Sequence, residues 1–201
     1  MYRAPVTTLF AIVLILPAIS LAYPPAVGIV GQNRDCLACH ANNGPWTDET
    51  KTILDVVDAT TGQSLRLPSG EFLIEVERGR TRTVLTQIGR RAGDDAPAPV
   101  RNAWLYVDPG QIETGALSKF APGWSVNLPM ACRIVGDKVS AYPGATMTSL
   151  PMTVRPGDAA QDATVELQVM LTAGESAKGN PNDWLSGNYL VRDIKLRVID
   201  P

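Results

Sequence analysis

Apolar and polar residues alternate along several stretches of this chain. In residues 71–77, the side chains of Phe72, Ile74 and Val76 fall on one side of the alternation and three glutamates fall on the other. Residues 164–171 repeat the pattern, with valine or leucine at every second position. Successive side chains of a β-strand point to opposite faces, so a period of two is typical of a half-buried strand, whereas a helix repeats about every 3.6 residues. These stretches are therefore predicted to be β-strands.

Further short strands follow from the same reasoning, and turn residues separate them. Many short strands with regular glycine and proline turns are typical of an antiparallel sandwich. The fold is therefore predicted to be mainly β, an antiparallel immunoglobulin-like β-sandwich. Turns are expected at Ser69-Gly70, Pro122-Gly123 and Pro156-Gly157, among others. The additional strand candidates are residues 52–58, 63–67, 82–89, 102–107, 124–128, 132–141, 150–155 and 193–198.

The first 22 residues differ in composition from the rest of the chain. Arg3 is followed by an apolar run over residues 9–19, and the segment ends in Ser20-Leu21-Ala22. A short positive start, an apolar centre and a small-x-small ending are the features of a secretory signal peptide. A membrane anchor is the alternative, but the run is short for a span and Pro17 interrupts it. We expect cleavage of residues 1–22 and export to the periplasm, the cell surface or the extracellular space.

Removal of this peptide leaves 179 residues that begin at Tyr23. One basic residue is lost with it, so the balance becomes 17 basic against 20 acidic residues. A mildly acidic chain without a basic run gives no support for nucleic-acid binding. No second apolar run reaches spanning length, so no stable transmembrane segment is expected after cleavage.

The chemistry of the chain is concentrated in Cys36-Leu37-Ala38-Cys39-His40. Cys-x-x-Cys-His is the attachment signature of c-type haem, because the two thiols match the two haem vinyl groups and the histidine reaches the iron. Zinc needs four ligands, and this chain has only a single histidine and the remote Cys132 to complete the set. A thioredoxin-like redox pair requires no histidine beside it. The motif therefore predicts one covalent haem c on Cys36 and Cys39, with His40 as an iron ligand.

The chain has a single histidine, His40, which excludes iron coordination by two histidines of this chain. The sixth ligand must then be a methionine, an amine, a group from a partner chain or water. Met130 and Met152 each follow a proline, and a stiff backbone helps a weak thioether to hold iron. Met147 would reach the iron from a loop. Met170 falls on the polar side of its strand, where it would face solvent or the haem.

The expected start Tyr23-Pro24, the early haem motif and the strands that follow it resemble cytochrome f. In that family the haem sits on an elongated β-sandwich, and the α-amino group of the mature N-terminal tyrosine is the sixth ligand. By this resemblance, the backbone amine of Tyr23 would bind iron opposite His40. An α-amine has a pKa of about 8, so ligation displaces only a modestly held proton. The chain departs from the family in the separation of Tyr23 and Cys36, which at 13 residues is shorter.

Three further expectations concern single residues. Trp46 follows the motif closely and is predicted to pack against the haem edge or to cover the haem crevice. Cys132 is expected to be a small buried residue. Arg90-Arg91 could pair with haem propionates, but a solvated loop is the favoured interpretation. The chain is thus divided into a signal peptide (1–22), a haem c attachment segment (23–50) and a β-sandwich domain (51–201).

Two functions are consistent with these features. With its only histidine committed to iron, the chain offers no Ser/His/Asp or Cys/His catalytic set and is not expected to be an enzyme. The favoured function is electron transfer by an exported monohaem c-type cytochrome, acting as a relay or docking subunit for other redox proteins. The alternative is a haem protein whose open sixth site binds or senses a small ligand.

Overall fold

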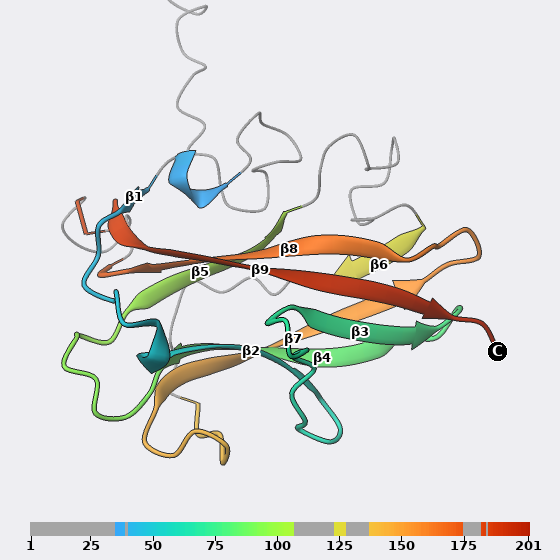
Figure 1. The fold of residues 1–201 in the computed structure, drawn as a ribbon, viewed down its shortest axis with the longest axis horizontal. Helices are drawn as coiled ribbons and strands as arrows, with labels where there is room; N and C mark the ends of the chain where they lie inside the picture. Colours follow the sequence, from blue (N-terminus) through green and yellow to red (C-terminus); the bar gives the residue numbers. More distant parts are fainter. Residues whose placement is uncertain (1–34, 39, 107–122, 128–136, 175–181, 184) are drawn as a thin grey trace, which may run out of the picture.

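Two β-sheets pack face to face in this chain (Figure 1). The computed structural model describes residues 35–38, 40–106, 123–127, 137–174, 182–183 and 185–201. The first sheet has the order β1-β9-β8-β5, and β3 also pairs with β9. Its strands are β1 (Ala41–Asn42), β3 (Phe72–Glu77), β5 (Val100–Tyr106), β8 (Ala163–Thr172) and β9 (Ser186–Ile199). The second sheet has the order β2-β4-β7-β6, formed by β2 (Thr52–Asp58), β4 (Arg82–Arg90), β6 (Trp124–Asn127) and β7 (Thr146–Pro156).

The core lies between the two sheets and is built from the alternating apolar positions. In β3, Phe72, Ile74 and Val76 are buried, as the period of two predicts. In β8, the predicted apolar face (Val165, Leu167, Val169 and Leu171) is also buried. The expectation of a mainly β sandwich of two sheets is confirmed. The described part of the chain contains only two short 3₁₀ helices, η3 (Cys36–Ala38) and η4 (Glu49–Lys51), and neither is long enough to cross a membrane.

Strand β9 departs from a purely antiparallel sandwich. It pairs antiparallel with β8 along one edge, but parallel with both β1 and β3 along the other. With 14 residues, β9 is long enough to hold β1 at its beginning and β3 towards its end. The first sheet is therefore mixed, and the segment that follows the cysteine motif is built directly into it through β1.

Two strand predictions need correction. Residues 63–67 form no continuous strand: Ser64 bridges Val57 and Arg66 bridges Phe72, each as an isolated pair. Of the predicted strand 132–141, the described part (137–141) runs as a loop and turn that lead into β7. The remaining predicted strands correspond to strands in the structure. Most of their ends lie within a few residues of the predicted boundary.

Candidate haem-attachment site

The described part of the cysteine motif is a tight turn. Cys36 begins η3, and the N–H of His40 donates to the carbonyl oxygen of Cys36 at 3.0 Å. Asp35 caps the turn, since its carboxylate oxygen Oδ1 accepts from the N–H of Ala38 at 3.1 Å. Cys36 is a thiol, and it is partly buried, as is His40. The turn therefore presents a thiol and an imidazole only four residues apart; Cys39 lies outside the described residues.

The turn rests on the outer face of the first sheet, the face turned away from the second sheet (Figure 1). The N–H of Cys36 donates to Oε1 of Gln168 at 3.2 Å, and the Cys36 sulfur lies 3.6 Å from the same oxygen. The other end of the Gln168 amide is also engaged, because Nε2 donates to Oε1 of Glu166 at 2.6 Å. Since an amide nitrogen donates and an amide oxygen accepts, the contact with Glu166 fixes the amide with its oxygen towards Cys36.

The end of the motif is tied to a different strand. After His40, the chain enters β1, where Ala41 pairs with Ser186 and Asn42 pairs with Gly187 of β9. The Asn42 side chain strengthens this connection, since its Oδ1 accepts from the N–H of Tyr189 at 3.0 Å. The motif is thus anchored on β8 at its start and beside β9 at its end. The described residues between these two anchors therefore lie over the outer face of β9.

The residues beneath this crossing belong to the outer faces of β8 and β9. Met170 is in register with Tyr189 between the two anchor points, and the side chain of Met170 has an exposed fraction of 0%. The pKa of Tyr189 is raised above its ordinary value, first by burial and then by the negative charge of Cys36, Glu166 and Asp35 when these are ionised. Its phenol therefore stays protonated at neutral pH.

Trp46 occupies a different place from the one predicted. Its exposed fraction is 2%, and it packs with the core residues between the sheets. Its backbone N–H donates to Oδ1 of Asn188 at 2.8 Å, and its indole Nε1 donates to the carbonyl oxygen of Pro97 at 2.7 Å. We therefore correct the expectation from sequence: Trp46 fastens the segment after the motif into the sandwich core, and does not cover the turn that holds Cys36.

The candidate iron ligands separate into three groups. Tyr23 and Met130 lie outside the described residues, as does Cys132. Met152 lies on β7 in the core between the sheets, so the whole first sheet separates it from the motif. Met147, expected in a loop, lies in β7 and is buried, again in the second sheet. Met170 is the methionine that the described structure brings to the same face as Cys36.

Arg90 is buried at the end of β4 with an exposed fraction of 3%, which corrects the expectation of a solvated loop. Its guanidinium binds both carboxylate oxygens of Asp94 and also donates to the carbonyl oxygen of Asp48. Arg90 holds the pKa of the Asp94 carboxyl below its ordinary value. Arg91 is exposed, and its guanidinium carbon lies 5.0 Å from the centre of the Tyr142 ring. The hydrogen-bonding groups of Arg90 are therefore committed to structure.

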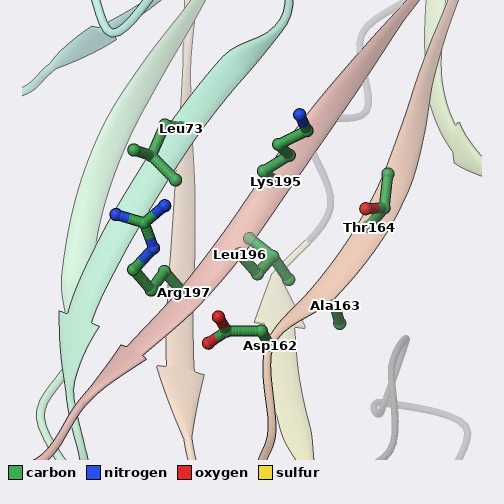
Figure 2. Close-up of a pocket in the computed structure, with 7 residues that line it drawn as sticks. All are labelled: Leu73, Asp162, Ala163, Thr164, Lys195, Leu196 and Arg197. Atoms are coloured by element: carbon green, nitrogen blue, oxygen red, sulfur yellow. The ribbon is translucent and has the colours of Figure 1, made fainter.

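A second feature of the outer face lies at the opposite end of β9. A shallow groove of about 450 Å³ lies there. Figure 2 shows Leu73 of β3 and Thr164 of β8 on either side of Lys195. Both cations are paired, Lys195 with Glu71 at 2.8 Å and Arg197 with Glu75 at 2.9 Å. The groove begins at Thr164, four residues along β8 from the Gln168 anchor, which is about 13 Å at about 3.3 Å for each residue of a strand. It is therefore separate from the cysteine turn.

Comparison with known proteins adds little to this site. No protein-family model matches the chain, and no curated protein is detectably similar to it in sequence. Among solved structures, the chain is similar to the ASH/PapD-like domain 7 of human CEP192, with 12% identity and a TM-score of 0.32. That match covers 78% of this chain and 92% of the other. A likeness of this kind says nothing about function.

The chemistry of the described donors is compatible with haem c. A thiol that can form a thioether and an imidazole that can bind iron share one turn, and the turn lies at the surface. The residues on which they rest are held by the sheet and not by a loop, which is the arrangement that keeps a ligand set rigid. Gln168, Met170 and Tyr189 complete the surroundings. Of these three residues, only Met170 could be singled out from the sequence, because it is an apolar residue on the polar side of an alternating strand.

Proposed function

We propose that this protein is an exported monohaem c-type cytochrome that transfers electrons between redox proteins. Haem c would be attached through Cys36 and Cys39, and His40 would be the proximal iron ligand. The observation that carries the proposal is the Cys-x-x-Cys-His motif on a tight turn whose first cysteine is hydrogen bonded to Gln168 of the sheet. We further propose export by the signal peptide 1–22 and a location in the periplasm, at the cell surface or outside the cell.

The chain's own contribution would be to hold the cofactor still. When bound, haem supplies an iron that takes one electron from a reduced partner protein and gives it to an oxidised one. Cys36, which is hydrogen bonded to Gln168 of β8, would form one thioether bond to the haem, and His40, just before β1, would supply an imidazole to the iron. A ligand set that is anchored to a sheet by hydrogen bonds is held rigid and moves little when the charge of its metal changes. The large sandwich suits a relay or docking subunit that works with other redox proteins.

The first test is haem content. The full chain, expressed with its signal peptide in cells that attach haem c, is expected to retain one haem after denaturation in acid and organic solvent. Its mass should increase by that of a single haem. The pyridine haemochrome spectrum should be that of a haem with two thioether bonds. Cys36→Ala and Cys39→Ala are each expected to give a spectrum with one thioether or none, whereas Cys132→Ser should retain the full complement.

The outcomes separate the alternatives. A full chain that binds no haem, or that binds zinc instead, would contradict the proposal. A haem protein that is high-spin when ferric and takes up carbon monoxide readily when reduced would favour the other function, a site open to small ligands. A six-coordinate low-spin haem with no such uptake supports electron transfer. The resemblance to cytochrome f points to the Tyr23 amine as the sixth ligand, and Met130 is a rival from the sequence; both residues lie outside the described part of the chain.

A further inference from the structure

If haem is attached as proposed above, the structure indicates which residue is the sixth iron ligand. Of the methionines in the described part of the chain, Met147 and Met152 belong to β7 in the second sheet. Met170 belongs to β8 in the first sheet, on the face crossed by the cysteine turn. A methionine usually fills apolar space in a core. Met170 is completely buried on the outer face, and the core lies on the other side of its strand.

The position of Met170 is fixed relative to both ends of the motif. Gln168, which receives the hydrogen bond from Cys36, precedes it by two residues on the same face of the strand. Two residues of a strand span about 7 Å, so the backbone of Met170 lies about that far from the anchor of the first cysteine. On β9, the register partner of Met170 is Tyr189, whose N–H donates to Oδ1 of Asn42, the second residue after the motif.

The side chain of Met170 is directed towards the end of the motif that carries His40. A Cβ atom added to Gly187 would lie 2.7 Å from Cε of Met170, so the thioether reaches as far as the backbone of Gly187. Gly187 is in turn the register partner of Asn42 in β1, the second residue after His40. The absence of a side chain at Gly187 is what leaves room for the methyl end of Met170.

The other polar groups on this face are less suitable. The Gln168 amide is held between Cys36 and Glu166. Thr172 donates its hydroxyl to the carbonyl oxygen of Gly174 at 3.0 Å. Tyr189 would bind iron as a phenolate, which first requires loss of its hydroxyl proton. A thioether needs no deprotonation, so the sulfur of Met170 can bind as it stands.

We propose that Met170 is the sixth ligand of the haem iron, binding through its sulfur opposite His40. Histidine and methionine together give a closed, six-coordinate site with a raised reduction potential, as expected of an electron carrier. The proposal replaces Tyr23 and Met130 in this role.

The test compares Met170→Leu with Met152→Leu in the haem-loaded full chain. Met152 is a matched control because it is an equally buried methionine in the other sheet. Met170→Leu is expected to keep one haem, to lose the weak long-wavelength band of methionine-ligated ferric haem, to bind carbon monoxide when reduced and to have a lower reduction potential. Met152→Leu should keep the band and the potential. Met170→His should restore a six-coordinate low-spin spectrum with a potential below that of the wild type.

A measurement on the unaltered protein covers the case in which Met170→Leu fails to fold. In the ferrous protein, labelled with ¹³C at its methionine methyl groups, one methyl resonance should be shifted strongly upfield by the haem ring. That resonance should persist in Met130→Leu, Met147→Leu and Met152→Leu. Its loss in Met130→Leu, or the loss of axial ligation when one residue is added before Tyr23, would overturn the assignment. An unchanged spectrum in Met170→Leu with haem retained would refute Met170 alone, whereas a chain without haem would refute the proposed function as well.

Discussion

The backbone N–H of Cys36 donates to the side-chain oxygen of Gln168, 132 residues further along the chain, at 3.2 Å. This contact joins the start of the cysteine motif to the middle of β8. Because Gln168 is itself completely buried and its other end is bound to Glu166, the contact has little freedom to shift. The turn is thereby held at one place on the sheet before any cofactor is considered.

Replacing Gln168 by leucine should weaken this anchorage. The substitution leaves the partly buried N–H of Cys36 without its acceptor, and such a loss costs about 1 to 3 kcal/mol. Chemical denaturation should report this as a lower midpoint, and the yield of covalently bound haem should fall. Gln87→Leu is the control, because Gln87 is also buried in a strand, yet its Oε1 has no hydrogen-bond partner within the described residues. Equal losses for the two variants would contradict a specific role for Gln168.

Gly187 is predicted to tolerate no side chain. An added Cβ would lie 2.1 Å from the carbonyl oxygen of Leu171, a backbone atom that cannot turn aside, as well as close to Met170. Forcing an extra methyl into a packed site costs about 1 to 3 kcal/mol. Gly187→Ala should therefore lower the free energy of unfolding by that amount, measured in urea. Ser186→Ala, at the exposed neighbouring position of β9, should change it by less than about 0.5 kcal/mol.

Asp58 should make stability depend on acid pH. The N–H of Thr61, followed by the guanidinium of Arg82, lowers the pKa of the Asp58 carboxyl from 3.8 to about 2. A carboxyl with a lower pKa in the folded state adds stability above its unfolded pKa, and this is lost as the pH falls from about 4 to about 2.

Asp58→Asn should remove that dependence. At neutral pH the loss should be about 1 kcal/mol, because solvent screens the partly exposed Arg82 side chain. The measurement is the free energy of unfolding in urea from pH 2 to 7. Asp95→Asn, an exposed loop position, controls for the change in net charge. An unaltered pH slope in Asp58→Asn would show that other carboxyl groups produce it.

Most of the fold could be predicted from the sequence because each strand of the sandwich shows its buried face as a local alternation of apolar and polar residues. The apolar face of β3 follows from alternation alone, and so does that of β8. The parallel pairing of β3 with β9 does not follow from alternation, because Phe72 and Ile194 are 122 residues apart and meet only in the folded sheet. Arg90 illustrates a second limit: two adjacent arginines near prolines are typical of a loop, but the first of them ends a strand and is buried against Asp94.

The site was predictable only where its residues are contiguous. Cys36 and His40 are recognised by spacing, whereas the contacts of Cys36 with Gln168 and of Asn42 with Tyr189 require the sheet to be assembled first. The interpretation of Trp46 as a haem contact relied on closeness in sequence. A turn of the chain after β1 instead directs this residue into the core, on the opposite side of the sheet from η3.

Tyr142 should couple stability to alkaline pH through Asp55. The phenol donates to Oδ2 of Asp55 at 3.0 Å, and burial, followed by the charge of Asp55, raises the pKa of Tyr142 from 10.0 to about 12. The sign is opposite to that of Asp58: this contribution to stability is complete below the unfolded pKa and is lost as the pH rises from about 10 to about 12.

Tyr142→Phe keeps the ring beneath Arg91 but removes the hydroxyl, so the free energy of unfolding at neutral pH should fall by about 1 to 2 kcal/mol. The alkaline slope should flatten, and one tyrosine should vanish from the late part of the ultraviolet titration. Combining it with Asp55→Asn closes a double-mutant cycle, in which strictly additive losses would mean that the two side chains do not interact.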